Sequence, residues 1–82
     1  MRIEVRLFAT LASHLPENAV DGSAILDVLP GLTADGVLRS LRVPEDMPRI
    51  MLVNGRDAAP EQPLQDGDVV SVFPPLAGGT ID

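Results

Sequence analysis

The sequence predicts an α+β fold in which a mixed sheet wraps around one main helix. Three observations lead to this class. Residues 2–9 alternate between apolar and charged side chains, Thr33 opens a stretch with helical periodicity, and residues 69–73 form a second apolar run between a turn and two prolines. Period-2 alternation is typical of half-buried strands, and i, i+3, i+4, i+7 spacing is typical of a helix that buries one face.

The length of 82 residues predicts a single small domain. A chain of this size buries roughly 60–65% of its unfolded surface, which is enough for one modest core. Hydrophobic residues make up 45% and charged residues 22%, so the composition is that of a folded globular protein. We expect residues 1–75 to form the domain and residues 76–82 to form a flexible C-terminal tail.

The charge and the residue types exclude several function classes. The formal net charge is −6 and the aromatic content is 2%, so neither phosphate neutralisation nor base stacking is supported, and we expect no nucleic-acid partner. All six basic residues are arginines and there is no cysteine, which leaves no lysine or thiol nucleophile. The N-terminal residues alternate in charge and the chain has no long apolar run, so we expect no signal sequence, no membrane partner and a cytoplasmic protein.

The first strand is expected over residues 2–9, with Ile3, Val5 and Leu7 on the buried face; the alternation can extend to Ala9. A short helical turn should follow and end before Pro16, with Leu11 and Leu15 packed inward. After a turn, residues 23–29 are apolar apart from Asp27. They predict a second strand, antiparallel to the first, although a short apolar run is also compatible with a buried helical turn.

The main helix is expected to begin after Thr33, whose hydroxyl suits the N-cap position. Asp35 complements the positive N-terminal end, and Leu32 and Val37 occupy the positions of a hydrophobic staple. The apolar residues that recur at helical spacing are Ala34, Val37, Leu38 and Leu41. Gly36 costs about 1 kcal/mol relative to alanine, so tertiary contacts must hold this helix of about ten residues.

The second half of the chain predicts a loop over 43–48, a strand over 49–53 and a tight turn at Asn54-Gly55. A long crossing over 57–65 should be anchored by Leu64. Asp66-Gly67-Asp68 then turns the chain into a central strand over 69–73. Two strands, one helix and at least two further strands is the order of a β-grasp fold, in which the first and last strands pair in parallel.

Two groups of residues that could suggest a catalytic or metal site are interpreted as structural. His14 is the single histidine, and nothing near it supplies an oxyanion hole or a nucleophile elbow, so we expect a surface histidine and no catalytic residue. Asp66-Gly67-Asp68 lacks the further oxygen ligands of a calcium loop, and we expect a turn and no metal site.

The stretch from Phe73 to Asp82 is the candidate functional segment. Pro74 and Pro75 end the strand because proline has no N–H for a ladder, and they project the chain stiffly. Leu76 and Ala77 are followed by Gly78 and Gly79, a pair without side chains that suits a narrow channel. Phe73 is either a core residue or, like Leu76, a contact for a partner protein.

The order and spacing of several short motifs resemble the MoaD/ThiS family of ubiquitin-like sulfur carriers, which includes the small subunit of molybdopterin synthase. The similar residues cover nearly the whole chain, most clearly its C-terminal half: Leu7-Phe8-Ala9, Val53-Asn54, Pro63-Leu64, Asp66-Gly67-Asp68, Phe73-Pro74-Pro75 and Gly78-Gly79. The Phe-Pro-Pro ending is closer to MoaD than to ThiS. One difference concerns the chemistry: these carriers end at the second glycine, whereas Thr80-Ile81-Asp82 follow Gly79 here.

The resemblance implies a carrier and not an enzyme. A ubiquitin-activating-like adenylyltransferase would use ATP to adenylate the Gly79 carboxylate, and a persulfide donor would convert it to a thiocarboxylate. No cofactor would be bound to the carrier itself. Gly78, Ala77, Leu76, Pro75 and Pro74 would thread the tail into a partner, here the MoaE-like large subunit of molybdopterin synthase. A protease would first remove Thr80, Ile81 and Asp82.

Three alternatives stay open on the sequence. The chain could be a β-grasp binding module that keeps its tail unprocessed, a ubiquitin-like modifier joined to lysines of other proteins, or a carrier for another sulfur pathway such as that of thiamine.

Overall fold

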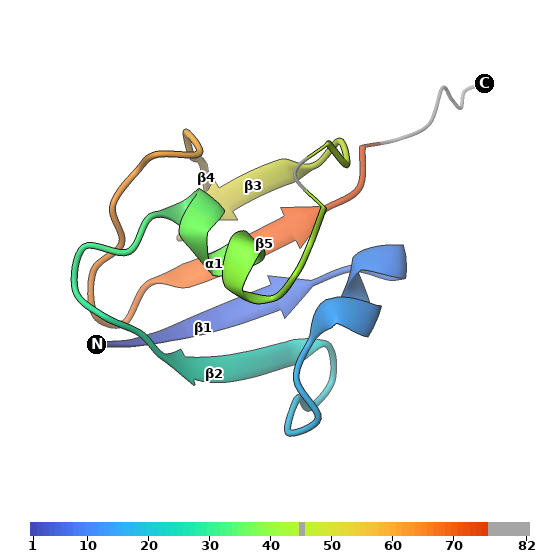
Figure 1. Cartoon of the computed structure of the whole chain (residues 1–82), viewed down its shortest axis with the longest axis horizontal. Helices are drawn as coiled ribbons and strands as arrows, with labels where there is room; N and C mark the ends of the chain where they lie inside the picture. The colour runs from blue at the N-terminus through green and yellow to red at the C-terminus, as the bar shows by residue number, and fades with distance from the viewer. Residues whose placement is uncertain (45, 76–82) are drawn as a thin grey trace.

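The structure, a computed structural model, describes residues 1–44 and 46–75. One mixed sheet packs against one face of a short helix (Figure 1). The elements in chain order are β1 (Arg2–Leu7), the 3-10 helix η1 (Ala9–His14), β2 (Ser23–Asp27), α1 (Ala34–Ser40), β3 (Ile50–Val53), β4 (Arg56–Asp57) and β5 (Val69–Phe73). The strand order in the sheet is β2-β1-β5-β3-β4.

The strand pairing confirms the predicted β-grasp topology. β1 and β5 pair in parallel at the centre, with Leu7 opposite Val72. β2 pairs antiparallel with β1, and β3 pairs antiparallel with β5. The central position predicted for residues 69–73 is therefore correct, with the predicted bounds.

The core lies between the sheet and α1. Alternation along the central strands directs every second side chain toward the helix, as the pattern predicts. Among the described residues, the buried apolar side chains are Ile3, Val5, Leu7, Leu11, Ala24, Ala34, Val37, Leu38, Val43, Met51, Val53, Leu64, Val70 and Val72. The list confirms the inward packing predicted for Leu11 and the anchoring role predicted for Leu64.

Helix α1 begins as expected, because the Thr33 hydroxyl accepts a hydrogen bond from the Gly36 backbone N–H at 3.0 Å. Two further helical N–H groups are bonded by the segment that crosses from β4 to β5: Ala34 donates to the Gln62 carbonyl and Asp35 to the Pro60 carbonyl. This crossing therefore completes the N-terminal cap of α1. The sequence did not indicate that contact.

Four boundaries and one strand differ from the predictions; one of the boundaries is the start of β3, which lies at Ile50 and not at residue 49. β1 ends at Leu7, because Ala9 has a φ of 55° and leaves the strand direction. β2 ends at Asp27 and not at residue 29. α1 ends at Ser40, since Arg42 has a φ of 64°, so the helix is shorter than expected. A two-residue strand, β4, pairs with β3 where the sequence indicated only a loop after the turn.

The turn between β3 and β4 is confirmed. Asn54 and Gly55 have φ values of 54° and 81°, the left-handed pair that a two-residue hairpin turn requires. None of the helices in the described part of the chain has the length and apolar character needed to cross a membrane. The cytoplasmic location stays a prediction.

Candidate functional site

The C-terminal segment leaves the sheet from its central strand. Pro74 and Pro75 follow β5 directly, with Pro74 half-buried and Pro75 exposed. The other residues assigned to the tail, namely Leu76, Ala77, Gly78, Gly79, Thr80, Ile81 and Asp82, lie outside the described residues. The site can therefore be described at the root of the tail.

An aromatic pair forms the centre of this root. The rings of Phe8 and Phe73 stack with centroids 4.4 Å apart and an angle of 13° between their planes. The Phe8 N–H donates to the Val72 carbonyl at 3.1 Å, which continues the parallel pairing of β1 and β5 and brings the two rings together. Phe73 is half-buried and Phe8 is 41% exposed. Phe73 is thus not a core residue but part of a stack at the surface.

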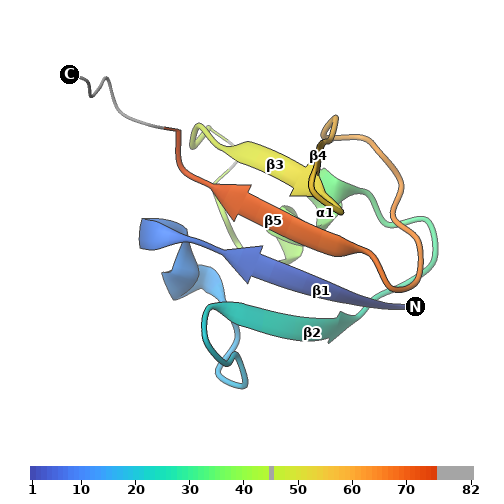
Figure 2. The same cartoon turned by 180° about the vertical axis from the view of Figure 1, so that it is seen from behind.

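Ile50 extends the apolar surface on the other side of β5. It lies opposite Phe73 in the β3–β5 register and is 44% exposed. Seen from behind in Figure 2, the ends of β1 and β5 and the start of β3 lie at one end of the sheet, where Pro74 and Pro75 follow β5. Phe8, Ile50 and Phe73 are called the tail-root patch below. Sequence reasoning missed Phe8 and Ile50, because their position depends on strand register.

Arg49 fixes the start of β3, directly beside this patch. Its guanidinium donates to Asp35 Oδ1 at 2.6 Å, to the Pro44 carbonyl at 3.0 Å and to the Met47 carbonyl at 3.3 Å. The Arg49 side chain is only 12% exposed. Charge-assisted bonds of this kind are stronger than neutral ones, so they join the loop before β3 firmly to α1.

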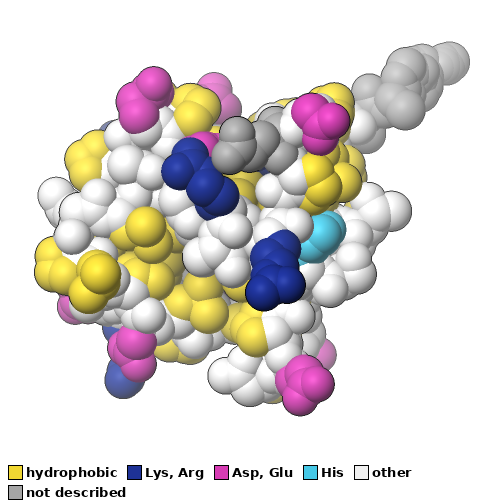
Figure 3. Space-filling model, viewed as in Figure 1, with side chains coloured by type: hydrophobic (Ala, Val, Ile, Leu, Met, Phe, Trp, Pro, Cys, Tyr) yellow, Lys and Arg dark blue, Asp and Glu magenta, His cyan; other side chains and the backbone are white. Residues whose placement is uncertain are grey.

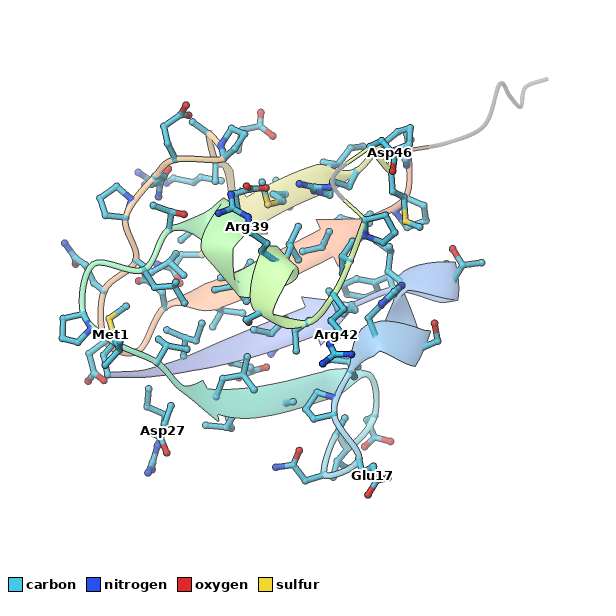
Figure 4. All side chains as sticks on the ribbon, in the orientation of Figure 1. Met1, Glu17, Asp27, Arg39, Arg42 and Asp46 are labelled. Carbon is cyan, nitrogen blue, oxygen red and sulfur yellow. The ribbon has the colours of Figure 1, made fainter. Side chains whose placement is uncertain are left out.

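Asp35 receives a second arginine on the same helix. Arg39, which Figure 4 labels on α1, donates from Nη2 to Asp35 Oδ2 at 2.6 Å, four residues earlier in the helix. The hydrogen bond from Arg39 lowers the pKa of Asp35 below its ordinary value, and Arg49 acts in the same direction, while partial burial opposes them. The carboxylate is therefore held in its charged form by its two partners.

A hollow lies at the opposite end of the sheet, between the β3–β4 turn and the start of β5. The polar groups around this hollow hydrogen-bond to one another and hold the turns in place. The Asn54 side chain donates to Asp68 Oδ1 at 2.9 Å and accepts from the Val69 N–H at 3.0 Å, while Asp68 Oδ2 accepts from the Gln65 N–H. Asp66-Gly67-Asp68 is a turn, as expected, and Gly67 has a φ of 88°.

Two further groups considered in the sequence are His14 and the possible metal ligands. His14 lies half-buried at the end of η1. Among residues 1–44 and 46–75, no group of three or more His, Cys, Asp or Glu side chains is placed to hold a metal ion.

Comparison with known proteins gives one family match and several similar chains. The ThiS family matches residues 5–79. A relative from Haloferax volcanii, small archaeal modifier protein 3, is 37% identical over 96% of this chain and 100% of its own length. The crystal structure of SAMP1 from the same organism has a TM-score of 0.74 and 29% identity, covering 96% of this chain and 100% of that one.

A chain from the complex of subunits 1 and 2 of molybdopterin-converting factor from Helicobacter pylori has a TM-score of 0.61 and 22% identity. The similar region covers 96% of the present chain and 100% of the Helicobacter pylori chain. At this level of identity the similarity establishes the shared fold alone.

Proposed function

Because this chain belongs to the ThiS family of ubiquitin-like β-grasp carriers and modifiers, we propose that it is a sulfur carrier that acts through the Gly79 carboxylate. The observation that carries this proposal is the extent of the family match, which continues through the proline pair and both glycines and ends at Gly79. The chain then serves as a carrier and not as a catalyst.

The proposed chemistry takes place on partner enzymes. A carboxylate is a poor electrophile, so an adenylyltransferase joins the Gly79 carboxylate to AMP and releases pyrophosphate from ATP. Sulfur from a persulfide donor then displaces AMP, and reduction of the resulting acyl disulfide by a thiol leaves the thiocarboxylate. Each step requires a free carboxylate on Gly79, so Thr80-Ile81-Asp82 must first be removed by a protease.

The tail-root patch supplies the docking surface in this proposal. Phe8 and Ile50 are large, exposed apolar side chains beside the strand that continues into the tail. Apolar and aromatic side chains at the centre of an interface contribute most of its binding energy. A partner that receives the tail would therefore cover Phe8, Ile50 and Phe73.

The sulfur acceptor is proposed to be the molybdopterin precursor, bound to a MoaE-like large subunit. The Phe73-Pro74-Pro75 ending, which is closer to MoaD than to ThiS, supports this choice. A thiamine pathway is the alternative acceptor within the same carrier chemistry.

A second candidate function is that of a protein modifier. The 37% identity to a small archaeal modifier protein favours it. In that case the activated Gly79 carboxylate would form an amide with a lysine of another protein, and the same removal of residues 80–82 would be needed. A binding module with an unprocessed tail is the third possibility.

The proposal is tested by comparing the full chain with a form that ends at Gly79. With a cognate activating enzyme, we expect ATP–pyrophosphate exchange for the shortened chain and none for the full chain. The matched control ends at Gly78 and should be inactive. Equal inertness of all three forms would contradict the carrier and modifier functions and favour the binding module.

The intact mass of the protein from its native host separates the remaining candidates. A chain ending at Gly79 with one oxygen replaced by sulfur supports the carrier. Attachment of Gly79 to lysines of other proteins supports the modifier.

A further inference from the structure

Strand β2 (Ser23–Asp27) forms one edge of the sheet, on the far side of β1 from β5. In both Figure 1 and Figure 2, no other described strand or helix lies beyond it. An edge strand presents backbone N–H and C=O groups that a further strand can use. At the opposite edge lies only the two-residue strand β4.

The register identifies which groups of β2 face outward. Met1 and Val28 exchange backbone bonds, and the Leu7 N–H donates to the Gly22 carbonyl. Bonded and non-bonded pairs alternate in an antiparallel ladder. The non-bonded pairs are therefore Arg2 with Asp27, Glu4 with Ile25 and Arg6 with Ser23. The Glu4 N–H accordingly donates to the backbone carbonyl of Asp68, on the β5 side of β1. Its partner Ile25 therefore points its own N–H and C=O to the open edge.

Of the three β2 residues whose backbone groups face outward, namely Ser23, Ile25 and Asp27, Ser23 is already hydrogen-bonded. Ser23 and Val20 exchange two backbone bonds of 3.1 and 2.8 Å, so the preceding turn covers that end of the edge. The open part is formed by Ile25 and Asp27 and continues toward Leu29. It accommodates a short extended segment and not a long sheet.

Apolar side chains gather along this edge. Of the five large hydrophobic residues exposed in the described part of the chain, three lie on β2 or directly beside it: Val20 at 67%, Ile25 at 52% and Leu29 at 80%. The other two, Phe8 and Ile50, belong to the tail-root patch. Exposed apolar side chains beside open backbone groups are the combination that strand addition uses.

The charges around this edge are acidic. Glu17 and Asp27 lie at opposite ends of β2 in Figure 4, and Asp21 is exposed in the turn that leads into the strand. The space-filling view shows acidic side chains at both ends of this lower margin (Figure 3). Cations also lie near this edge. Arg2 and Arg6 on β1 pair with Asp27 at 3.4 Å and with Glu4, and Figure 4 shows Arg42 over β2 in this view.

We propose that the β2 edge binds an extended segment of a partner protein in which apolar residues alternate with basic ones. The segment would bond to the N–H and C=O groups of Ile25 and Asp27. An apolar side chain would lie beside Ile25, and a lysine or arginine two residues along would lie beside Asp27. This site goes beyond the carrier function and does not require the tail.

Charge argues against a second copy of this chain as the occupant. Pairing of two β2 edges would bring Asp21 and Asp27 of both copies together, and each chain has a formal net charge of −6. Like charges at close range disfavour such a pairing.

The test uses the full chain, labelled with ¹⁵N, and the synthetic peptide Thr-Val-Thr-Lys-Thr-Val-Thr, whose symmetric pattern suits either strand direction. We expect hydrogen exchange of the Ile25 and Asp27 amides to slow by at least about tenfold at saturation, which corresponds to about 1.4 kcal/mol. Substituting glutamate for the peptide lysine should weaken binding, and replacing the threonines that flank the lysine with proline should abolish it.

Two variants locate the site. Ile25→Pro removes one outward N–H and keeps the β1–β2 ladder, since proline is tolerated where the N–H faces solvent. It should weaken peptide binding by about tenfold or more. Asp27→Lys should make the protein bind the glutamate peptide more tightly than the lysine peptide. This substitution leaves the backbone groups of β2 in place. The matched control is Ile50→Thr, an exposed isoleucine at the tail root, which should bind the peptide as the wild type does.

Three results would overturn the proposal. The first is peptide binding that Asp27→Lys leaves unchanged in both strength and charge preference. The second is no slowing of the Ile25 and Asp27 amides at any peptide concentration. The third is slowing of those amides that grows with protein concentration in the absence of peptide, which would assign the edge to a second copy.

Discussion

Asp35 is the residue that joins two parts of the fold. Its carboxylate accepts one hydrogen bond from Arg39 within α1 and one from Arg49 at the start of β3. The Asp35 and Arg49 side chains are 19% and 12% exposed, so water screens this pair weakly. The tail-root patch begins at the next residue, Ile50, and its position therefore depends on this contact.

Replacing Asp35 should destabilise the protein in a pH-dependent way. The pKa of Asp35 is lowered in the folded state, so its contribution is fully present above the unfolded value and is lost as the pH falls through the folded value. We expect Asp35→Asn to lower the free energy of unfolding at pH 7 by about 1–3 kcal/mol. Denaturant unfolding at several pH values should show the difference from the wild type shrinking below the ordinary carboxyl pKa of 3.8.

The control for this prediction is Asp27→Asn. The Arg2–Asp27 pair is 70% and 80% exposed, and exposed pairs of this kind contribute little. Its effect should stay within about 0.5 kcal/mol at all pH values. A pH-independent loss in Asp35→Asn would contradict the role given to the charged carboxylate.

Among the elements, α1 shows how packing can override propensity. Gly36 lies in the first turn, and a Cβ at this position would meet Leu32 Cδ1 at 2.7 Å and the Thr33 hydroxyl at 3.2 Å. Leu32 is half-buried and packs against the core. The glycine is thus used because the hydrophobic staple and the N-cap both approach the helix closely there.

Gly36→Ala should therefore not produce the gain of about 1 kcal/mol that helix propensity alone predicts. We expect an unchanged or lower free energy of unfolding, because Leu32 must move to admit the methyl group. In a Leu32→Ala background the closer obstacle is absent and only the Thr33 hydroxyl at 3.2 Å remains, so the same change should recover part of the gain. Chemical denaturation of the four proteins in this double-mutant cycle measures the coupling. A full gain in the wild-type background would contradict the argument.

At the scale of the whole molecule, the sequence predicted the elements with strong periodicity best. Residues 69–73 form an apolar run that is bounded by a turn on one side and by two prolines on the other. Both predicted bounds of this strand are correct. β4 was missed because two exposed residues carry no apolar pattern. The end of β1 was misjudged, since alanine gives no sign of the positive φ at Ala9.

The candidate site was only partly predictable for a related reason. The proline pair and Phe73 are local signals. The positions of Phe8 and Ile50 follow from the parallel β1–β5 and antiparallel β3–β5 registers, which bring distant residues to one end of the sheet. The same holds for the open edge of β2, because a strand is recognised as an edge only when the strand order is known.

The two exposed surfaces share the face of the sheet that points away from α1 but lie at different places on it, one at the tail root and one at the β2 edge, and this separation can be tested with a matched pair of isoleucines. Ile50 is 44% exposed in the tail-root patch and Ile25 is 52% exposed on the β2 edge. Ile50→Asp should raise the KM of the activating enzyme for the chain ending at Gly79 by about tenfold, because it puts a charge into an apolar contact. Ile25→Asp should leave that KM within about twofold and instead weaken binding of the basic peptide.

Both substitutions are at exposed positions, so circular dichroism and denaturant unfolding should show folded proteins of similar stability. This control separates a lost contact from a lost fold. If Ile50→Asp destabilises the sheet, Ile50→Thr provides the milder change at the same position. An equal rise in KM for Ile25→Asp and Ile50→Asp would mean that one partner covers both surfaces, and the division into a tail-root patch and a separate binding site on the β2 edge would then be wrong.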